Sequence, residues 1–117
     1  MNKRSIGKEF EQRAVDFLQD KGYLILERNY QCKFGEIDII ALDREYLVFV
    51  EVKYRKNRES GYPEEAVNYQ KQRKISKTAG YYCLQKNILE NVCCRFDVIA
   101  IDAGEIRHYE NAFLYCG

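Results

Sequence analysis

EIDIIALDREYLVFVEVKY, residues 36–54, is the stretch that decides the fold. Residues 36–43 and 46–54 are rich in β-branched and aromatic side chains, and the polar residues 43–45 between them are typical of a tight turn. The two runs therefore predict neighbouring strands. Residues 46–54 form an almost continuous apolar run, which indicates a central strand covered by other elements on both faces.

Further elements are predicted on both sides of this pair. Apolar residues at steps of three and four indicate a first helix that ends at Lys21-Gly22, and Pro63 followed by two glutamates indicates the start of a long second helix. The predicted helices cover 6–20 and 63–86, and the predicted strands cover 23–30, 36–43, 46–54, 95–102 and 105–110. The first two strands and the last two should each form a hairpin. The order α-β-β-β-α-β-β favours an α/β fold with a mixed β-sheet flanked by helices.

The composition excludes several classes of protein. With 117 residues, 46% of them hydrophobic, the chain suffices for one buried core and not for two ordinary domains, so we expect one domain over residues 1–117. Its net charge of +1 gives no overall attraction to nucleic acid or to an anionic membrane. No apolar run resembles a membrane span or a secretion signal, which predicts a cytoplasmic protein with no membrane partner.

The cysteines argue against a disulfide framework and against a zinc finger. Five are present without a CxxC pair, and His108 is the single histidine that could complete a zinc site. We expect the cysteines to be reduced and buried as small hydrophobic side chains. We expect His108 to be a surface residue of the last strand, and Asp97 to accept structural hydrogen bonds.

Three charged residues interrupt the two central strands. Asp38 lies in the first apolar run, and Glu51 and Lys53 lie in the second. Residues two apart in a strand share a face, so Glu51 and Lys53 are neighbours, and strand pairing would bring Asp38 beside Glu51. Two unpaired carboxylates raise each other's pKa and resist burial, and a divalent cation removes that cost.

Mg²⁺ or Mn²⁺ is the cofactor that this arrangement favours, because such cations bind a few carboxylate oxygens and leave room for waters and a phosphate. Lys53 would then orient the attacking water or stabilise the negative charge that develops at phosphorus. The residues thus predict a site that hydrolyses phosphodiester bonds. A Glu-x-Lys pair alone is more often a solvent-facing ion pair, so the prediction depends on Asp38 as well.

The same residues resemble a known group of nucleases. The spacing Asp38…Glu51-x-Lys53 is similar to the PD-(D/E)xK superfamily, whose fold is restriction-endonuclease-like. The resemblance extends over nearly the whole chain to the YraN-type bacterial family, which is described as Holliday-junction-resolvase-like. It is carried by GEIDII at 35–40, FVEVKYR at 49–55, the Gly61-x-Pro63-x-x-Ala66-Val67 segment and RFDVIAID at 95–102.

This resemblance implies a role for each residue of the motif. Asp38 and Glu51 would be metal ligands, and Lys53 would be the catalytic lysine. Glu11 would be an additional acid supplied by the first helix, with Glu9 as the alternative at that position. The substrate that the resemblance implies is nucleic acid, DNA in particular, with branched DNA suggested by analogy of fold alone.

Positive charge gathers around the motif. Residues 51–77 contain eight basic and four acidic residues, a local excess that suits binding of a phosphate backbone. Arg55, Lys71 and Lys74 are the expected nucleic-acid contacts, Lys71 being also implied by the family resemblance. The alternative is an ordinary solvated helix face.

Two other functions remain open for a chain with these features. The first is a nucleic-acid-binding protein that keeps the nuclease fold without significant catalysis. The second is a protein-interaction module in which the three charged residues are a relic, which the electrostatic cost of keeping them together disfavours. The sequence does not choose between a monomer and a homodimer.

Overall fold

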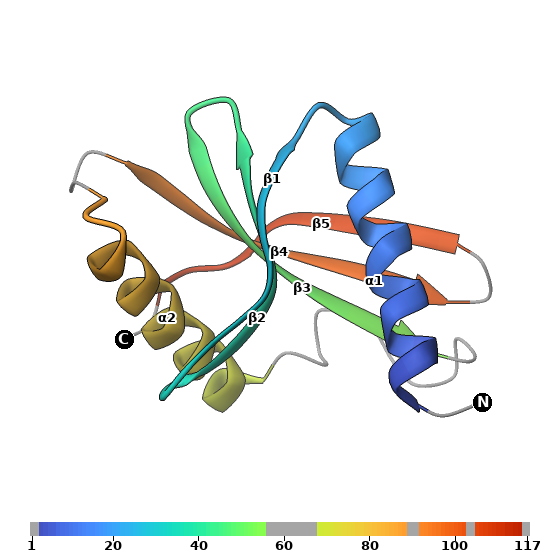
Figure 1. Cartoon of the computed structure of the whole chain (residues 1–117), viewed down its shortest axis with the longest axis horizontal. Coiled ribbons are helices and arrows are strands. Elements are labelled where there is room, and N and C mark those ends of the chain that lie inside the picture. Colours follow the sequence, from blue (N-terminus) through green and yellow to red (C-terminus); the bar gives the residue numbers. More distant parts are fainter. Residues whose placement is uncertain (1–2, 56–67, 89–91, 103–104, 116–117) are drawn as a thin grey trace.

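The structure is a computed structural model that describes residues 3–55, 68–88, 92–102 and 105–115 (Figure 1). These residues form two helices, α1 (Lys3–Asp20) and α2 (Tyr69–Gln85), and five strands, β1 (Leu24–Cys32), β2 (Gly35–Asp43), β3 (Tyr46–Arg55), β4 (Cys93–Asp102) and β5 (Glu105–Phe113). The predicted order α-β-β-β-α-β-β is confirmed. No helix in these ranges is long and apolar enough to cross a membrane.

The five strands form one mixed sheet in the order β1-β2-β3-β4-β5. Neighbouring strands are antiparallel except β3 and β4, which run parallel. The expected hairpins form between β1 and β2 and between β4 and β5. Figure 1 shows α1 and α2 on opposite faces of the sheet, so β3 is covered on both sides, as its apolar run predicts.

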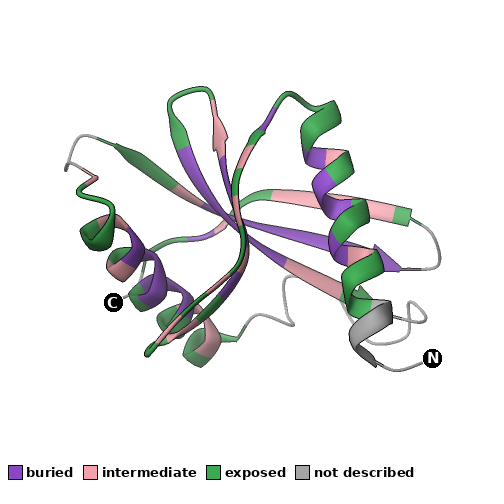
Figure 2. Cartoon of the chain, viewed as in Figure 1, coloured by how far each residue is buried: buried purple, intermediate pink, exposed green. Residues whose placement is uncertain are grey.

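Each helix closes one hydrophobic core against the sheet (Figure 2). On the α1 face, Ala14 and Leu18 pack with Val48 and Val50 of β3. On the α2 face, Ile75, Ala79 and Tyr82 pack with Phe49 and Phe96, among others. Alternate residues of β3 thus enter different cores, and full burial of each large side chain contributes roughly 1.5–3 kcal/mol.

The second helix begins later than the sequence pattern predicts. Asn68 is its N-cap, with extended backbone angles φ −71° and ψ 172°, and its side chain accepts a hydrogen bond from the Lys71 N–H at 2.9 Å. A helix running from Pro63 through Asn68 is therefore wrong, because an extended residue cannot lie inside a helix. Asn is among the preferred N-cap residues, and its side chain replaces a missing intrahelical acceptor. Pro63 itself lies outside the described residues.

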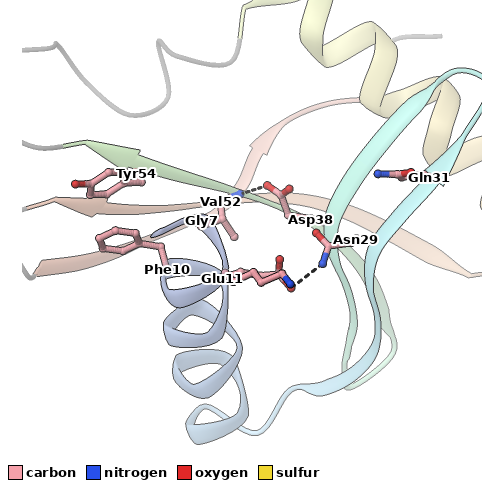
Figure 3. Close-up of a pocket in the computed structure, with 9 residues that line it drawn as sticks. Gly7, Phe10, Glu11, Asn29, Gln31, Asp38, Val52 and Tyr54 are labelled. Atoms are coloured by element: carbon pink, nitrogen blue, oxygen red, sulfur yellow. Dashed lines mark hydrogen bonds between the residues drawn. The ribbon is translucent and has the colours of Figure 1, made fainter. Parts of the chain in front are cut away.

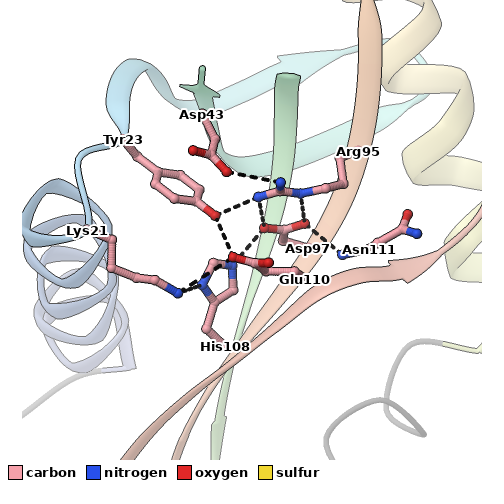
Figure 4. A network of polar contacts seen from close by, with 8 residues as sticks. All are labelled: Lys21, Tyr23, Asp43, Arg95, Asp97, His108, Glu110 and Asn111. Carbon is pink, nitrogen blue, oxygen red and sulfur yellow. Dashed lines mark hydrogen bonds and ion pairs between the residues drawn. The ribbon is translucent and has the colours of Figure 1, made fainter. Parts of the chain in front are cut away.

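A buried polar network joins the end of α1 to β4 and β5 (Figure 4). At its centre Asp97 accepts hydrogen bonds from Arg95, from the His108 ring at 2.7 Å and from the Asn111 N–H at 3.0 Å. Burial would raise the pKa of Asp97, but these hydrogen bonds outweigh it and lower the pKa. The predicted structural role of Asp97 is confirmed.

His108 is not the surface residue that was expected. Its side chain is only 3% exposed, because the ring lies between Asp97 and the Lys21 ammonium, whose Nζ is 2.8 Å from Nδ1. An edge strand still has one face turned toward the protein, and His108 points to that face.

The expectation that the cysteines are buried is wrong for the four that the structure describes, and Cys116 lies outside the described residues. Cys93 and Cys94 are exposed, and Cys32 and Cys83 are only partly buried. Cys93 and Cys94 are the first two residues of β4, and the strand enters the core only after them. The Cys83 thiol contacts Cys94, and this hydrogen bond lowers the pKa of Cys94 to about 7.

Candidate functional site

The predicted site lies where β2 and β3 part. Their pairing runs from Asp43 opposite Tyr46 to Ile39 opposite Val50, and no pair follows. The next free N–H of β3, that of Val52, donates to Oδ2 of Asp38 at 2.8 Å (Figure 3). The side chain of Asp38 thus takes the place of a strand partner, which fixes its carboxylate in the gap beside Glu51.

The carboxyl groups of Asp38 and Glu51 are in contact and withdrawn from water. Glu51 is 7% exposed and Asp38 is partly buried. Burial, the charge of Glu51 and a hydrogen bond between the two carboxyls raise the pKa of Asp38 to about 7, against an opposing hydrogen bond from Val52. The pair therefore holds a proton up to about neutral pH, because two adjacent carboxylates resist ionising together.

Two lysines face this pair from different elements. Lys53 follows Glu51 on the same face of β3, with its Nζ 4.0 Å from Oε2 of Glu51, and Lys71 of α2 places its Nζ 3.1 Å from the same oxygen. Burial and the neighbouring Lys71 ammonium lower the pKa of Lys53. Burial also acts to lower the pKa of Lys71, but its hydrogen bond with Lys53 and the charge of Glu51 outweigh this and raise it. Lys71 is thus the more firmly charged of the two.

The acid that α1 turns toward the site is Glu11. Its side chain is nearly buried and accepts hydrogen bonds from Arg28 at 2.8 Å and from Asn29 at 3.1 Å. Glu9 is exposed and pairs with Arg13 at 3.4 Å on the outer side of the helix. Of the two alternatives, the geometry therefore selects Glu11 as the helical acid near Asp38.

A hollow of about 520 Å³ opens beside Asp38 on the α1 face of the sheet (Figure 3). Glu11, Asn29, Gln31 and Val52 contribute to its wall, and a stacked aromatic pair, Phe10 and Tyr54 with ring centroids 3.8 Å apart, closes one side. Its lining thus combines carboxylates and amides with an apolar wall, as suits a polar ligand with a planar part.

The donor set fits a hard divalent cation. Within the described ranges, no three or more His, Cys, Asp or Glu side chains group into a metal cluster, so the protein would supply two carboxylates, Asp38 and Glu51. Oxygen donors of this number are what Mg²⁺ and Mn²⁺ take when waters and phosphate complete the shell. The contact between the two carboxyl groups is the supporting observation: Glu51 is only 7% exposed, and burial together with the charge of Glu51 raises the pKa of Asp38.

The three residues predicted to contact nucleic acid lie in different places. Lys71 lies in the site, whereas Lys74 is exposed one turn further along α2. Arg55 ends β3, and its side chain lies outside the described residues.

Arg28 and Asn29 hold Glu11, a role that the sequence did not indicate, although Asn29-Tyr30 belongs to the segments that resemble the YraN-type family. The signal that the sequence offers for Asn29 is an asparagine inside a strand pattern, and the structure gives it φ 55°, an angle that Asn adopts more readily than most residues.

Comparison with known proteins gives a family for this chain. The model of a family described as "Uncharacterised protein family UPF0102" matches residues 10–101. A UPF0102 protein of Lachnoclostridium phytofermentans is 53% identical over 113 residues, which are 97% of this chain and 96% of that protein. UPF0102 proteins of Thermodesulfovibrio yellowstonii and Persephonella marina are each 49% identical, over 97% and 92% of this chain and 99% and 91% of their own. The matched region includes every predicted site residue.

Proposed function

The chain belongs to the uncharacterised protein family UPF0102, the YraN family that its motifs resemble, and on this premise we propose that it is a metal-dependent nuclease. Its reaction is the hydrolysis of phosphodiester bonds in DNA, with branched or structured DNA as the substrate class that the family resemblance suggests. The protein would act in the cytoplasm.

The observation that carries this proposal is the contact between Asp38 and Glu51 with two lysines beside it. Two structural ion pairs would keep the two acids apart, whereas here the carboxyl groups of Asp38 and Glu51 touch, and that contact raises the cost of burying them. The pKa of Asp38, raised to about 7, reports that cost. Residues kept at such a cost cluster at functional sites more often than elsewhere.

In the proposed reaction each side chain has one task. Asp38 and Glu51 would hold Mg²⁺ or Mn²⁺, which when bound neutralises phosphate charge and makes water a better nucleophile. Lys53, next to Glu51, orients the water or stabilises charge on the phosphate, and burial beside the Lys71 ammonium lowers its pKa. Lys71 holds Glu51 in place through the 3.1 Å ion pair. Glu11 would act as an outer acid toward waters in the hollow.

One observation favours the alternative of a nucleic-acid-binding protein without significant catalysis. The Lys71 ammonium already neutralises Glu51 at 3.1 Å, so half of the carboxylate charge is compensated without a metal. A site of this kind could bind a phosphate through its lysines and never recruit a cation. The two functions therefore differ in whether a divalent cation competes successfully with Lys71.

Cleavage and metal binding decide between these two functions. Purified protein is incubated with labelled single-stranded, duplex and four-way-junction DNA in Mg²⁺, Mn²⁺ or EDTA, with Glu51→Gln as the matched inactive variant. Metal-dependent cleavage that the variant lacks supports the nuclease. Binding of DNA without cleavage in any metal, and without calorimetric heat from Mn²⁺, would assign the binding function instead.

A further inference from the structure

The outer side of α2 carries positive charge that lacks an acidic partner within the described part of the chain. The helix contains four basic residues and no acidic one. Lys71 pairs with Glu51, whereas Arg73, Lys74 and Lys77 are exposed and form no ion pair with any described residue. Like charges three and four apart on a helix are mildly destabilising, so this composition does not serve the helix itself.

These three side chains and Gln70 line a shallow groove of about 240 Å³ on the helix surface. A groove lined by basic and amide side chains is complementary to a chain of phosphates. The groove also lies on the helix whose Lys71 reaches the candidate site.

The tip of the β1–β2 hairpin lies against the same helix (Figure 1). Lys33 and Phe34 form its two-residue turn, and a Cβ added to the following Gly35 would lie 3.2 Å from Oγ1 of Thr78 and 4.0 Å from Cβ of Lys74. Such turns favour Asn-Gly or other glycine-containing pairs, so the turn geometry does not explain a Lys-Phe sequence.

Phe34 and Tyr81 form an aromatic pair at this junction that stays open to solvent. Their ring centroids are 5.9 Å apart in an edge-to-face arrangement, and Nζ of Lys33 lies 5.2 Å from the Phe34 centroid and 6.0 Å from that of Tyr81. Phe34 is nevertheless 40% exposed. The surface therefore combines an aromatic platform with a lysine over it, beside a basic groove.

We propose that the outer side of α2 and the hairpin tip bind an unpaired strand of nucleic acid, with a base stacked on Phe34 and the phosphates held by Lys74 and Lys77. Every base has a π-face, so aromatic platforms beside basic grooves bind single strands without reading their sequence. A paired base is already stacked within its duplex, and the platform therefore favours unpaired over paired strands.

The surface runs along α2 toward the candidate site. The link between strand binding and cleavage therefore rests on the proposed nuclease function. Lys71, Lys74 and Tyr81 follow one side of α2, and at 1.5 Å per residue the path from Lys71 to Tyr81 is about 15 Å long. A strand lying along it would present a phosphate to Asp38 and Glu51 a few nucleotides from the stacked base. The substrate class is then nucleic acid with an unpaired segment next to the cleaved bond.

Binding measured in EDTA tests this surface without requiring cleavage. Fluorescein-labelled oligothymidine and a duplex of equal length are titrated with protein, and fluorescence anisotropy gives each affinity. Phe34→Ala should weaken oligothymidine binding roughly tenfold, the loss of one stacked base, and leave duplex binding within about twofold. Phe34→Leu, which keeps apolar contact with Tyr81 but lacks the ring, should show the same selective loss even if Phe34→Ala fails to fold.

Tyr46→Ala is the matched control, because Tyr46 is 37% exposed and lies at the opposite end of β3 from Lys53. It should bind both probes as the unmodified protein does. The double variant Lys74→Ala and Lys77→Ala should weaken binding of both probes and flatten the dependence of log affinity on log salt by about 1–2 units.

Two results would overturn the inference: no preference of the unmodified protein for oligothymidine over the duplex, or unchanged oligothymidine binding in both Phe34 variants. A selective Phe34 effect together with no cleavage in any metal would support the strand-binding surface and reject the nuclease. Metal-dependent cleavage with no Phe34 effect would reject the surface and retain the nuclease.

Discussion

Replacing Asp38 by asparagine should stabilise the metal-free protein at alkaline pH. The pKa of Asp38 is about 7 in the folded chain and starts from 3.8, so the folded state holds a proton that the unfolded chain has released. The contribution of Asp38 to the free energy of unfolding should therefore be greatest below about pH 4. It should fall as the pH rises from about 4 to about 7. The amide in the Asp38→Asn variant has no such proton to lose, and its carbonyl can still accept from Val52.

The expected magnitude follows from the size of the pKa shift. One pKa unit corresponds to about 1.4 kcal/mol, so a shift of about three units gives at most about 4 kcal/mol above pH 7. Because Asp38 is only partly buried and shares its proton with Glu51, we expect roughly 2–4 kcal/mol, a large part of the ~5–15 kcal/mol of a domain this size.

Urea unfolding at pH 4.5, 6 and 8 in EDTA measures this difference. At pH 8 Asp38→Asn should raise the midpoint by about 1–2 M, and at pH 4.5 the two proteins should nearly coincide. Asp20→Asn, the same substitution at an exposed position of α1, is the control and should change neither midpoint. A less stable Asp38→Asn protein at pH 8, or a difference that does not vary with pH, would refute the interpretation of the carboxylate pair.

Four further substitutions or reactions probe the site and its support. Glu51→Gln should weaken Mn²⁺ binding in calorimetry without unfolding the protein, and unchanged affinity would remove the metal site. Lys53→Ala should keep that affinity for Mn²⁺ and slow cleavage by about 10²–10³-fold in a single-turnover assay. An unchanged cleavage rate would show that the lysine has no part in the reaction. Asp97→Ala should cost about 3–5 kcal/mol in urea unfolding, because it removes the buried acceptor of Arg95, His108 and the Asn111 N–H and leaves Asp43 as the remaining carboxylate beside Arg95. With iodoacetamide at pH 7, Cys94 should be alkylated faster than Cys93, as mass spectrometry would detect, since contact with a neighbouring thiol lowers the pKa of Cys94 to about 7.

The strands and the first helix could be predicted because their signals are local. Alternating and continuous apolar runs specify β2 and β3, and the short polar turn between them makes them neighbours. The same local reasoning could have chosen Glu11 over Glu9, because Glu11 shares the stripe of buried Ala14 and Leu18 on α1. The predicted start of α2 is wrong for a local reason too. Pro63 and Asn68 both signal a helix start, and the prediction takes Pro63 whereas the helix begins after Asn68.

The parts that could not be predicted depend on contacts between distant segments. His108 was assigned to the surface because nothing near it in the sequence indicates that Asp97 and Lys21 enclose its ring. Lys71 was expected to meet substrate, and its ion pair with Glu51 appears only when α2 is packed across β3. Periodicity gives the face of an element and leaves open which other element meets that face.

The parallel pairing of β3 with β4 has a consequence for the order of folding. Its partners are far apart in the chain, as Tyr46 and Cys93 are, whereas short turns join β1 to β2 and β2 to β3. Contacts between distant segments close more slowly than local ones, so the three-stranded meander should form before α2 and β4 dock. That meander already contains Asp38, Glu51 and Lys53 but lacks Lys71. The carboxylates would then meet during folding before their second lysine arrives, and a divalent cation at this stage would speed refolding by neutralising them.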